Sequence, residues 1–259
     1  MNQALVIARK EIIDGLRDVR SVIASLFYAL MGPITVGLVS LKTGTDSKSA
    51  PAVLIGMMAI FTLVSAFVGG MNIAMDTIAG ERERRSLLPL LLNPVSRRSV
   101  VLGKWLAVSF FAVAGLAVDI AGFIVVFVSA KLPANILRPY VLLPLAVGVF
   151  SLPLLAASLQ LLISTMSRAV KEAQTYLSLI VFLPMALGMF LVFCPTAKRW
   201  WFAFLPLVGQ QLQLEALMSG RQIGLFQTIA LGYLTVALAV FVLMIATNRL
   251  HRDEIVYGS

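Results

Sequence analysis

The sequence has 259 residues, of which 59% are hydrophobic and only 13% are charged, and its formal net charge is +9. Soluble domains are about half apolar and about a quarter charged, so this chain has too little polar surface for a soluble fold of its size. Several apolar stretches exceed the roughly 20 residues that cross the hydrocarbon core of a bilayer. Such stretches must be helical, because in lipid a helix satisfies its own backbone hydrogen bonds, and they lack the alternation of a barrel strand. We therefore predict an all-α integral membrane protein.

The scarcity of cysteine and histidine and the net charge argue against further kinds of site. The single cysteine, Cys194, excludes a disulfide framework within one chain, and the single histidine, His251, leaves little room for a histidine-ligated metal. We expect neither a metal nor a cofactor. In a membrane protein the positive excess indicates basic loops that face anionic headgroups on the cytoplasmic side, and not the binding of nucleic acid.

Residues 1–20 form the first predicted element. Their apolar side chains fall on one helical face, at Leu5, Ala8, Ile12, Leu16 and Val19. Charged side chains lie mostly around the rest of the helix. The pattern favours a helix that lies along the cytoplasmic interface of the membrane. The alternative is a merely solvated helical tail.

Six nearly uncharged stretches follow, each long enough to span the membrane. They are residues 21–41, 51–75, 106–130, 140–166, 173–193 and 225–247. Fourteen Lys and Arg residues fall in the N-terminal tail, the 76–105 connection, the fourth connection and the C-terminal tail, against seven on the opposite side. The positive-inside rule then predicts a multi-pass protein of the cell membrane with both termini in the cytoplasm.

The 76–105 connection contains acidic and leucine-rich stretches in addition to the basic residues that would orient the protein in the membrane. Glu81 and Glu83 alternate with arginines, a leucine-rich stretch follows over residues 87–92, and Pro94 comes directly after it. An amphipathic helix between two spans can dock into a groove on a soluble partner. The alternative is a basic loop that only sets the topology.

This connection also resembles the first cytoplasmic loop of the permease subunits of type-2 ABC exporters. That loop has a Gly-Glu-x-Glu run, several leucines, a Pro-x-x-Arg and a Gly-Lys at the next span. The matching residues are Glu81, Glu83, Leu87, Leu90 to Leu92, Pro94, Arg97, Gly103 and Lys104, whereas Arg85-Ser86 stands where Gly-Thr is usual.

The resemblance extends over essentially the whole chain, and it implies a fold and partners. It implies an interfacial N-terminal helix, six spans, a coupling helix seated in a cleft of a separate ATPase subunit, and a pair of permease copies around a central path. The implied ATPase-coupling residues are Glu81, Glu83, Leu87, Leu90, Leu91, Pro94 and Arg97.

No phosphate-binding loop of the form G-x-x-x-x-G-K-[ST] is present in the sequence. Gly103-Lys104 is followed by Trp105, and Arg98 stands where the motif needs its first glycine. We therefore predict a permease subunit of an ABC exporter that is not itself an enzyme, with ATP hydrolysis on another polypeptide.

Residues 194–224 are too interrupted for a further span. Two tryptophans indicate the outer membrane interface, and a short apolar run followed by polar residues favours short re-entrant helices before the last span. The candidate pathway or gate residues here are Gln210, Gln211 and Glu215. The resemblance implies a lid, most like that of the sodium-extruding branch of these permeases, with Na⁺ or another small or amphipathic solute as cargo. A simple surface loop is the alternative.

Asp119 lies near the middle of the third predicted span. An unpaired acid at that depth costs roughly 3 kcal/mol on insertion scales. It either binds a cation or proton on the transport pathway, or it forms an interhelical hydrogen bond with Gln160, Ser158 or a similar side chain.

Two other function classes fit the sequence less well. A secondary transporter would run on an ion gradient, and the inverted repeats with broken helices that would indicate it are not evident. An intramembrane hydrolase would need a membrane histidine, a second deep acid beside Asp119, or a set of zinc ligands, and the sequence provides none of these.

Overall fold

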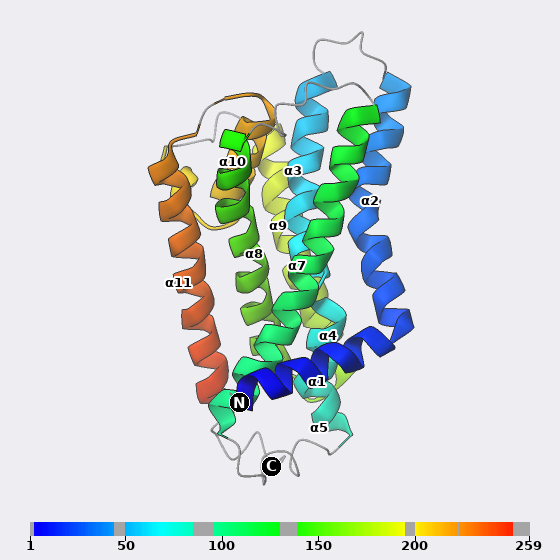
Figure 1. Cartoon of the computed structure of the whole chain (residues 1–259), viewed down its shortest axis with the longest axis vertical. Coiled ribbons are helices and arrows are strands. Elements are labelled where there is room, and N and C mark those ends of the chain that lie inside the picture. Colours follow the sequence, from blue (N-terminus) through cyan, green and yellow to red (C-terminus); the bar gives the residue numbers. More distant parts are fainter. Residues whose placement is uncertain are drawn as a thin grey trace.

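The computed structural model describes residues 3–43, 50–84, 96–129, 139–194, 200–221 and 223–250. Within these ranges all regular elements are helical, and six helices are long and apolar enough to cross a membrane. They run side by side with their ends at two opposite faces of a bundle (Figure 1). The predicted all-α membrane fold with six spans is confirmed.

The spanning segments are longer than hydropathy indicates. They are α2 (Val19–Thr43), an interrupted helix from α3 (Ala50–Val68) to α5 (Glu81–Glu83), α7 (Arg97–Ser129), α8 (Pro139–Met166), α9 (Val170–Phe193) and α11 (Leu225–Leu250). Helical structure therefore continues through much of the predicted 76–105 loop. Hydropathy detects only the apolar part of such a helix, whereas here polar side chains at its end bond to the rest of the bundle and keep it helical.

The second span is interrupted by a turn and then by a π-helical turn. α3 ends at Val68, the turn Gly69–Gly70 follows, and the chain resumes as α4 (Met71–Met75) and then as the π-helical turn η1 (Asp76–Gly80). A Cβ atom on Gly69 would lie 2.9 Å from the carbonyl oxygen of Phe111 on α7, so the two backbones are in direct contact. π-Helical turns occur frequently at functional sites, and this one leads directly into Glu81.

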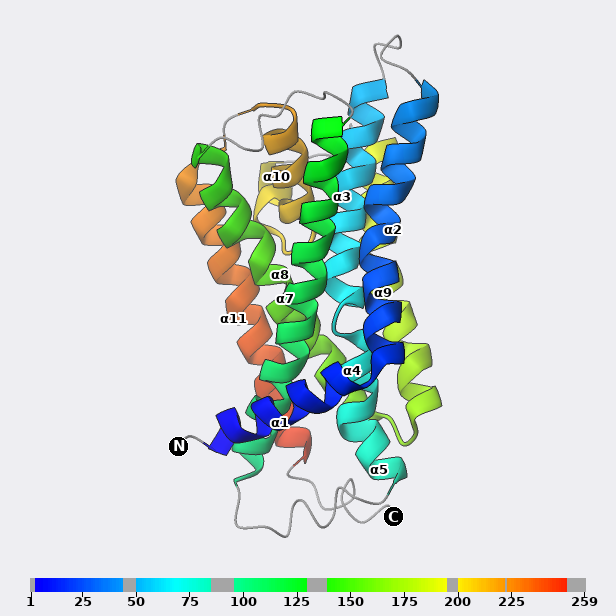
Figure 2. The same cartoon turned by 45° about the vertical axis from the view of Figure 1, so that its right-hand side comes forward.

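Helix α1 (Gln3–Arg17) crosses one end of the bundle at a steep angle to the spans (Figure 2). It packs on α7 through Ala4 and Ala8, and a Cβ on Gly103 would meet Ile7 at 2.7 Å. Small residues permit this close approach. Consequently Leu5 and Leu16 of the predicted apolar stripe face outward and are more than half exposed. The chain turns from α1 into α2 at Asp18, and we call this end of the bundle the α1 end.

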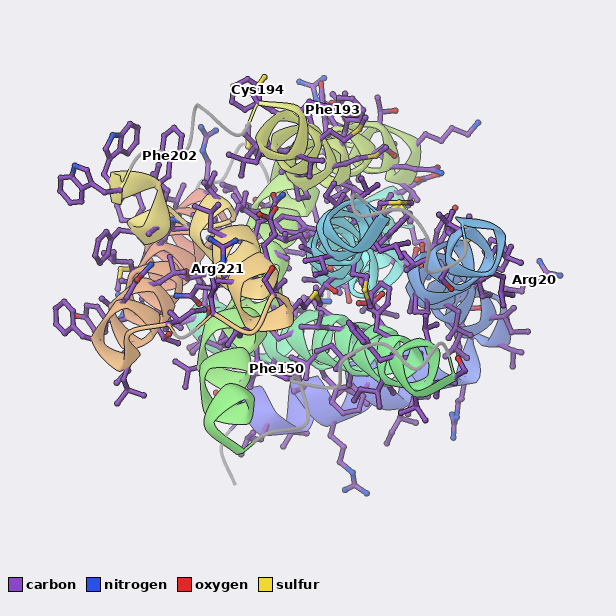
Figure 3. The ribbon with its side chains drawn as sticks, turned by 90° about the horizontal axis from the view of Figure 1, so that it is seen from above. Arg20, Phe150, Phe193, Cys194, Phe202 and Arg221 are labelled. Atoms are coloured by element: carbon purple, nitrogen blue, oxygen red, sulfur yellow. The ribbon has the colours of Figure 1, made fainter. Side chains whose placement is uncertain are left out.

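Two short helices occupy the opposite end, before the last span. They are the 3₁₀ helix η4 (Trp200–Phe204) and α10 (Val208–Met218). Seen from above, α10 sits among the spans (Figure 3), where it packs against α3, α8, α9 and α11. This end is called the α10 end.

Candidate functional site

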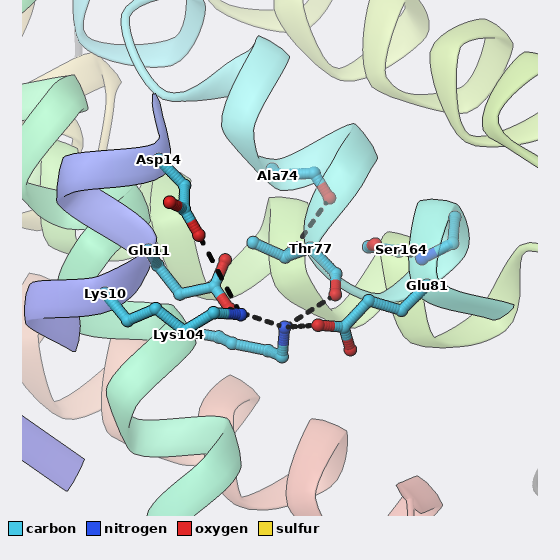
Figure 4. A network of polar contacts seen from close by, with 9 residues as sticks. Lys10, Glu11, Asp14, Ala74, Thr77, Glu81, Lys104 and Ser164 are labelled. Carbon is cyan, nitrogen blue, oxygen red and sulfur yellow. Dashed lines mark hydrogen bonds and ion pairs between the residues drawn. The ribbon is translucent and has the colours of Figure 1, made fainter. Parts of the chain in front are cut away.

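Lys104 on α7 is completely buried at the α1 end, although a lysine is almost never fully buried without a partner. Its ammonium nitrogen lies 2.8 Å from Oε1 of Glu81, 3.1 Å from Oε1 of Glu11 and 2.7 Å from the carbonyl oxygen of Thr77 (Figure 4). All three ammonium protons are therefore satisfied. One side chain thereby joins α7 to α1, to η1 and to the end of the second span.

The local sequence explains why these groups meet. Glu11 follows Ala8 on the inner face of α1, where the small residues let that helix lie against α7. Glu81 begins α5 directly after η1, and the Thr77 hydroxyl donates to the carbonyl of Ala74 within the same helical segment. Two carboxylates around one ammonium leave this cluster with one net negative charge. We call Lys104, Glu11 and Glu81 the lysine triad.

A cavity of about 310 Å³ adjoins the lysine triad between α1 and the second span. It is lined by Lys10, Glu11, Asp14, Gly15, Asp18, Ile73, Asp76, Thr77, Glu81 and Arg84. Two cationic groups at its rim are already paired, because Arg84 lies 3.3 Å from Asp76 and Lys10 lies 3.9 Å from Asp14. The remaining carboxylates make the cavity acidic.

Helix α5, which precedes residues 85–95, is hydrogen-bonded to the connection between α8 and α9 and to the start of α9. Arg82 donates to the carbonyl of Ser167 after the end of α8, at 2.9 Å. An oxygen of Glu83 accepts the backbone N–H of Val170, the first residue of α9, at 2.9 Å. Ala169, the residue at the N-cap position of α9, offers no side-chain acceptor, so Glu83 supplies from another helix the acceptor and the negative charge that a helix N-terminus favours.

The segment that follows residues 85–95 is bound to a different span. Arg97 donates to the carbonyl of Leu250, the last residue of α11, at 3.2 Å. The predicted coupling residues Leu87, Leu90, Leu91 and Pro94 lie outside the described residues. The structure thus brings Glu81, Glu83 and Arg97 to one end of the bundle, each engaged with a different helix.

The predicted gate residues lie on α10 at the other end. The Gln210 side chain accepts the N–H of Leu207 at 2.6 Å and donates to Thr235 of α11 at 2.7 Å. Gln211 donates to the carbonyl of Gly188 in α9 and to Glu215, both at 3.1 Å. These glutamines hold α10 between α9 and α11, and Leu207 takes a positive φ of 72° at its start.

Asp119 is buried where α7 meets α2 and α3, with a relative exposure of 1%. Thr62 of α3 hydrogen-bonds to its carboxylate. Gln160 instead donates to the carbonyl of Phe67, and Ser158 bonds to Trp105 and Leu154. The interhelical partner of the acid is thus Thr62, and the two partners considered from the sequence bond elsewhere.

A family profile described as "ABC-2 family transporter protein" matches residues 5–245, which is most of the chain. The chain belongs to this family. It is 33% identical over 217 residues to the ABC transporter permease protein NatB of Bacillus subtilis strain 168, an alignment that covers 78% of this chain and 55% of NatB. It is also 33% identical over 109 residues to the probable ABC transporter permease protein NosY of Stutzerimonas stutzeri, covering 40% of this chain and 38% of NosY.

The comparisons confirm the predicted relationship to ABC permeases, and the six long apolar helices confirm a multi-pass membrane protein. The chain spans about half the length of NatB. Among the described residues no group of three or more His, Cys, Asp or Glu side chains is placed to hold a metal ion, and the charged groups of the triad bind one another.

Sequence reasoning missed two residues of this ABC-2 permease site. Glu11 was one charged residue among several on α1, and Arg82 was counted only as a basic residue of the loop. Lys104 was part of the family motif, but its burial was not predicted. The available signal was a lysine about two turns inside a helix that is mostly apolar afterwards, a position that demands a nearby acid.

Proposed function

We propose that this ABC-2 permease is the membrane subunit of an ATP-driven exporter and that it couples to a separate ATPase subunit. The observation that carries the proposal is the attachment of both ends of the 85–95 segment to the bundle. The entry side bonds to α7, α8 and α9 through the lysine triad, Arg82 and Glu83, and the exit side bonds to α11 through Arg97.

These attachments suit the transmission of force. A displacement of a helix over residues 87–92 by a closing ATPase dimer would pass into four spans and, through Glu11, into α1. The bond between Lys104 and Glu81 resists being stretched most, because Lys104 is fully buried and breaking the bond would leave its charge without that partner. Glu81 and Glu83 act in this proposal as positioning residues that transmit movement.

The proposal places the α1 end on the cytoplasmic side of the cell membrane. The excess of Lys and Arg at this end supports that orientation. The outward Leu5 and Leu16 of α1 support an interfacial position, since apolar side chains beside charged ones favour the headgroup boundary. We further propose that two copies of the permease enclose the path.

The cargo and the gate belong to the same proposal. α10 would close the outer end of the path, with Gln210, Gln211 and Glu215 holding it in place. Na⁺ or another small or amphipathic solute is the proposed cargo, supported by the resemblance of the Leu205–Leu217 run to sodium-extruding permeases.

The test is reconstitution in vesicles with an ABC ATPase subunit that co-purifies with this chain. We expect a stable complex that hydrolyses ATP. Its cargo efflux should require ATP and should persist when a protonophore removes the proton gradient. Leu90→Asp or Leu91→Asp should abolish assembly or ATPase stimulation, because a charge would be desolvated in an apolar groove.

A matched control is Leu41→Asp, since Leu41 is 81% exposed at the far end of α2. It should leave assembly intact. Efflux that follows an ion gradient without ATP would indicate a secondary transporter. Unchanged assembly and transport in Leu90→Asp and Leu91→Asp would show that the 85–95 segment only sets topology.

A further inference from the structure

Asp119 has an unused oxygen in the centre of the bundle. The carboxylate is almost fully enclosed, its Oδ2 has no hydrogen-bond partner among the described residues, and Thr62 hydrogen-bonds to the carboxylate. Buried polar atoms are nearly always paired, and each exception in a folded protein demands an explanation. An ion or a proton that completes the site is such an explanation.

On the described helices that surround Asp119, no basic residue lies near this carboxylate. The helices α3 and α8 contain no charged residue, and the two charged residues of α2, Arg20 and Lys42, lie at its ends. At 1.5 Å per residue they are about 18 and 15 Å along the helix from Gly32, the residue beside Asp119. Lys104 on the same helix is about 22 Å away by the same measure and is occupied by its own acids.

Two further oxygen atoms belong to helices that pack beside Asp119, one on the Thr62 side chain and one on the backbone of α2 within about a turn of Gly32. Thr62 can donate to the carboxylate and still offer a lone pair. Pro33 of α2 has no N–H, so the carbonyl of Ala29 one turn earlier lacks its helical donor. Gly32, between them in sequence, lies so close that a Cβ there would be 3.2 Å from Oδ1 of Asp119. Ala29 is itself buried.

We propose that Asp119, Thr62 and the carbonyl of Ala29 form a binding site for one monovalent alkali cation. A single carboxylate balances one positive charge, whereas a divalent cation such as Ca²⁺ takes six to eight oxygens and usually several carboxylates. The bound cation removes the cost of an unpaired charge in the membrane interior.

The role of this site in transport rests on the proposed function, in which the site would lie on the path of a transported ion or of an ion coupled to transport. Binding itself does not depend on the ATPase or on transport. It can therefore be tested on the permease alone, and a failure of the site is distinguishable from a failure of the exporter proposal.

The experiment measures the thermal unfolding midpoint of the full chain in nanodiscs during titration with NaCl, KCl or LiCl, with choline chloride holding the ionic strength constant. A ligand that binds only the folded state raises this midpoint in a saturable manner. We expect at least one alkali cation to do so at neutral pH. Asp119→Asn should abolish the response, and Thr62→Val should raise the half-maximal concentration at least tenfold.

Thr228→Val is the matched control, because Thr228 of α11 is equally buried and donates to the carbonyl of Gly224, which precedes that helix. It should respond like the parent protein. If Asp119→Asn does not fold, the half-maximal cation concentration of Thr62→Val tests the proposal. The proposal is overturned if no alkali cation exceeds choline, if stability responds to pH alone, which would make Asp119 a proton site, or if Thr62→Val responds like Thr228→Val.

Discussion

The ammonium nitrogen of Lys104 lies 2.8 Å from Oε1 of Glu81, which joins the third span to the residue where the second span leaves its π-helical turn. The same nitrogen bonds to Glu11 of α1. A movement of the second span at this end therefore cannot occur without moving α1 and α7 or breaking a buried ion pair. This physical constraint leads to the first prediction.

Replacing Lys104 by Met should destabilise the fold by about 3 kcal/mol, because it leaves two carboxylates facing each other without their cation. Lys10→Met is the control, since that ammonium is mostly exposed and 3.9 Å from its acids, and it should cost well under 1 kcal/mol. Equilibrium unfolding in mixed micelles measures both. Adding Glu11→Gln and Glu81→Gln to Lys104→Met should restore part of the loss, and equal effects of the two lysine variants would show that the triad is unimportant.

Replacing Glu83 by Ala should cost about 1 kcal/mol, the usual effect of losing an acceptor at a helix N-terminus. It should also reduce ATP-driven transport, because the second span loses its attachment to α9. Adding Ala169→Asp supplies an acceptor within α9, since Ala169 has the extended backbone of an N-cap residue.

The double variant separates stability from coupling. We expect its unfolding free energy to return to that of the parent protein while transport stays low. Recovery of transport together with stability would mean that Glu83 serves only as a cap. Both quantities are measured on the same preparation, by unfolding and by efflux from vesicles.

Gly69→Ala should destabilise the bundle by about 1 to 3 kcal/mol through overpacking. The new methyl group would meet the backbone of α7 at Phe111 and Ala112, at 2.9 and 3.1 Å, and backbone cannot move aside as a side chain can. Gly224→Ala is the control, because no atom lies within 4 Å of a Cβ at that position. Thermal unfolding should separate the two variants clearly, and equal midpoints would contradict the contact between the second and third spans.

The proposed orientation predicts which cysteines are labelled in intact cells. Cys194, the single cysteine of the chain, follows α9 at the α10 end. A membrane-impermeant maleimide should label it from outside. In a Cys194→Ser background, Ser96→Cys at the α1 end should react only after permeabilisation. The opposite pattern would invert the topology.

The membrane class and the six spans followed from sequence because they depend on local composition. About 20 apolar residues must be helical in lipid wherever they occur, and neighbours in the fold do not alter that requirement. The Glu81–Lys104 motif could likewise be found as a pattern of residue types. Helical structure continues past residue 75 into the predicted connection, where Arg82 bonds to Ser167 and Glu83 to the start of α9, contacts that hydropathy does not include.

The residue pairings were decided by the tertiary structure alone. From sequence, Asp119 had Gln160 and Ser158 as candidate partners, yet the faces of α3 and α7 that meet bring Thr62 to it instead. Which faces meet depends on where backbones can approach, as Gly69 approaches Gly115 at a distance that a side chain would prevent. In the same way, small residues on α1 and not its leucines turned toward α7 and carried Glu11 to the buried Lys104. Composition determined that this chain spans a membrane, and packing between distant helices determined which of its charges meet there.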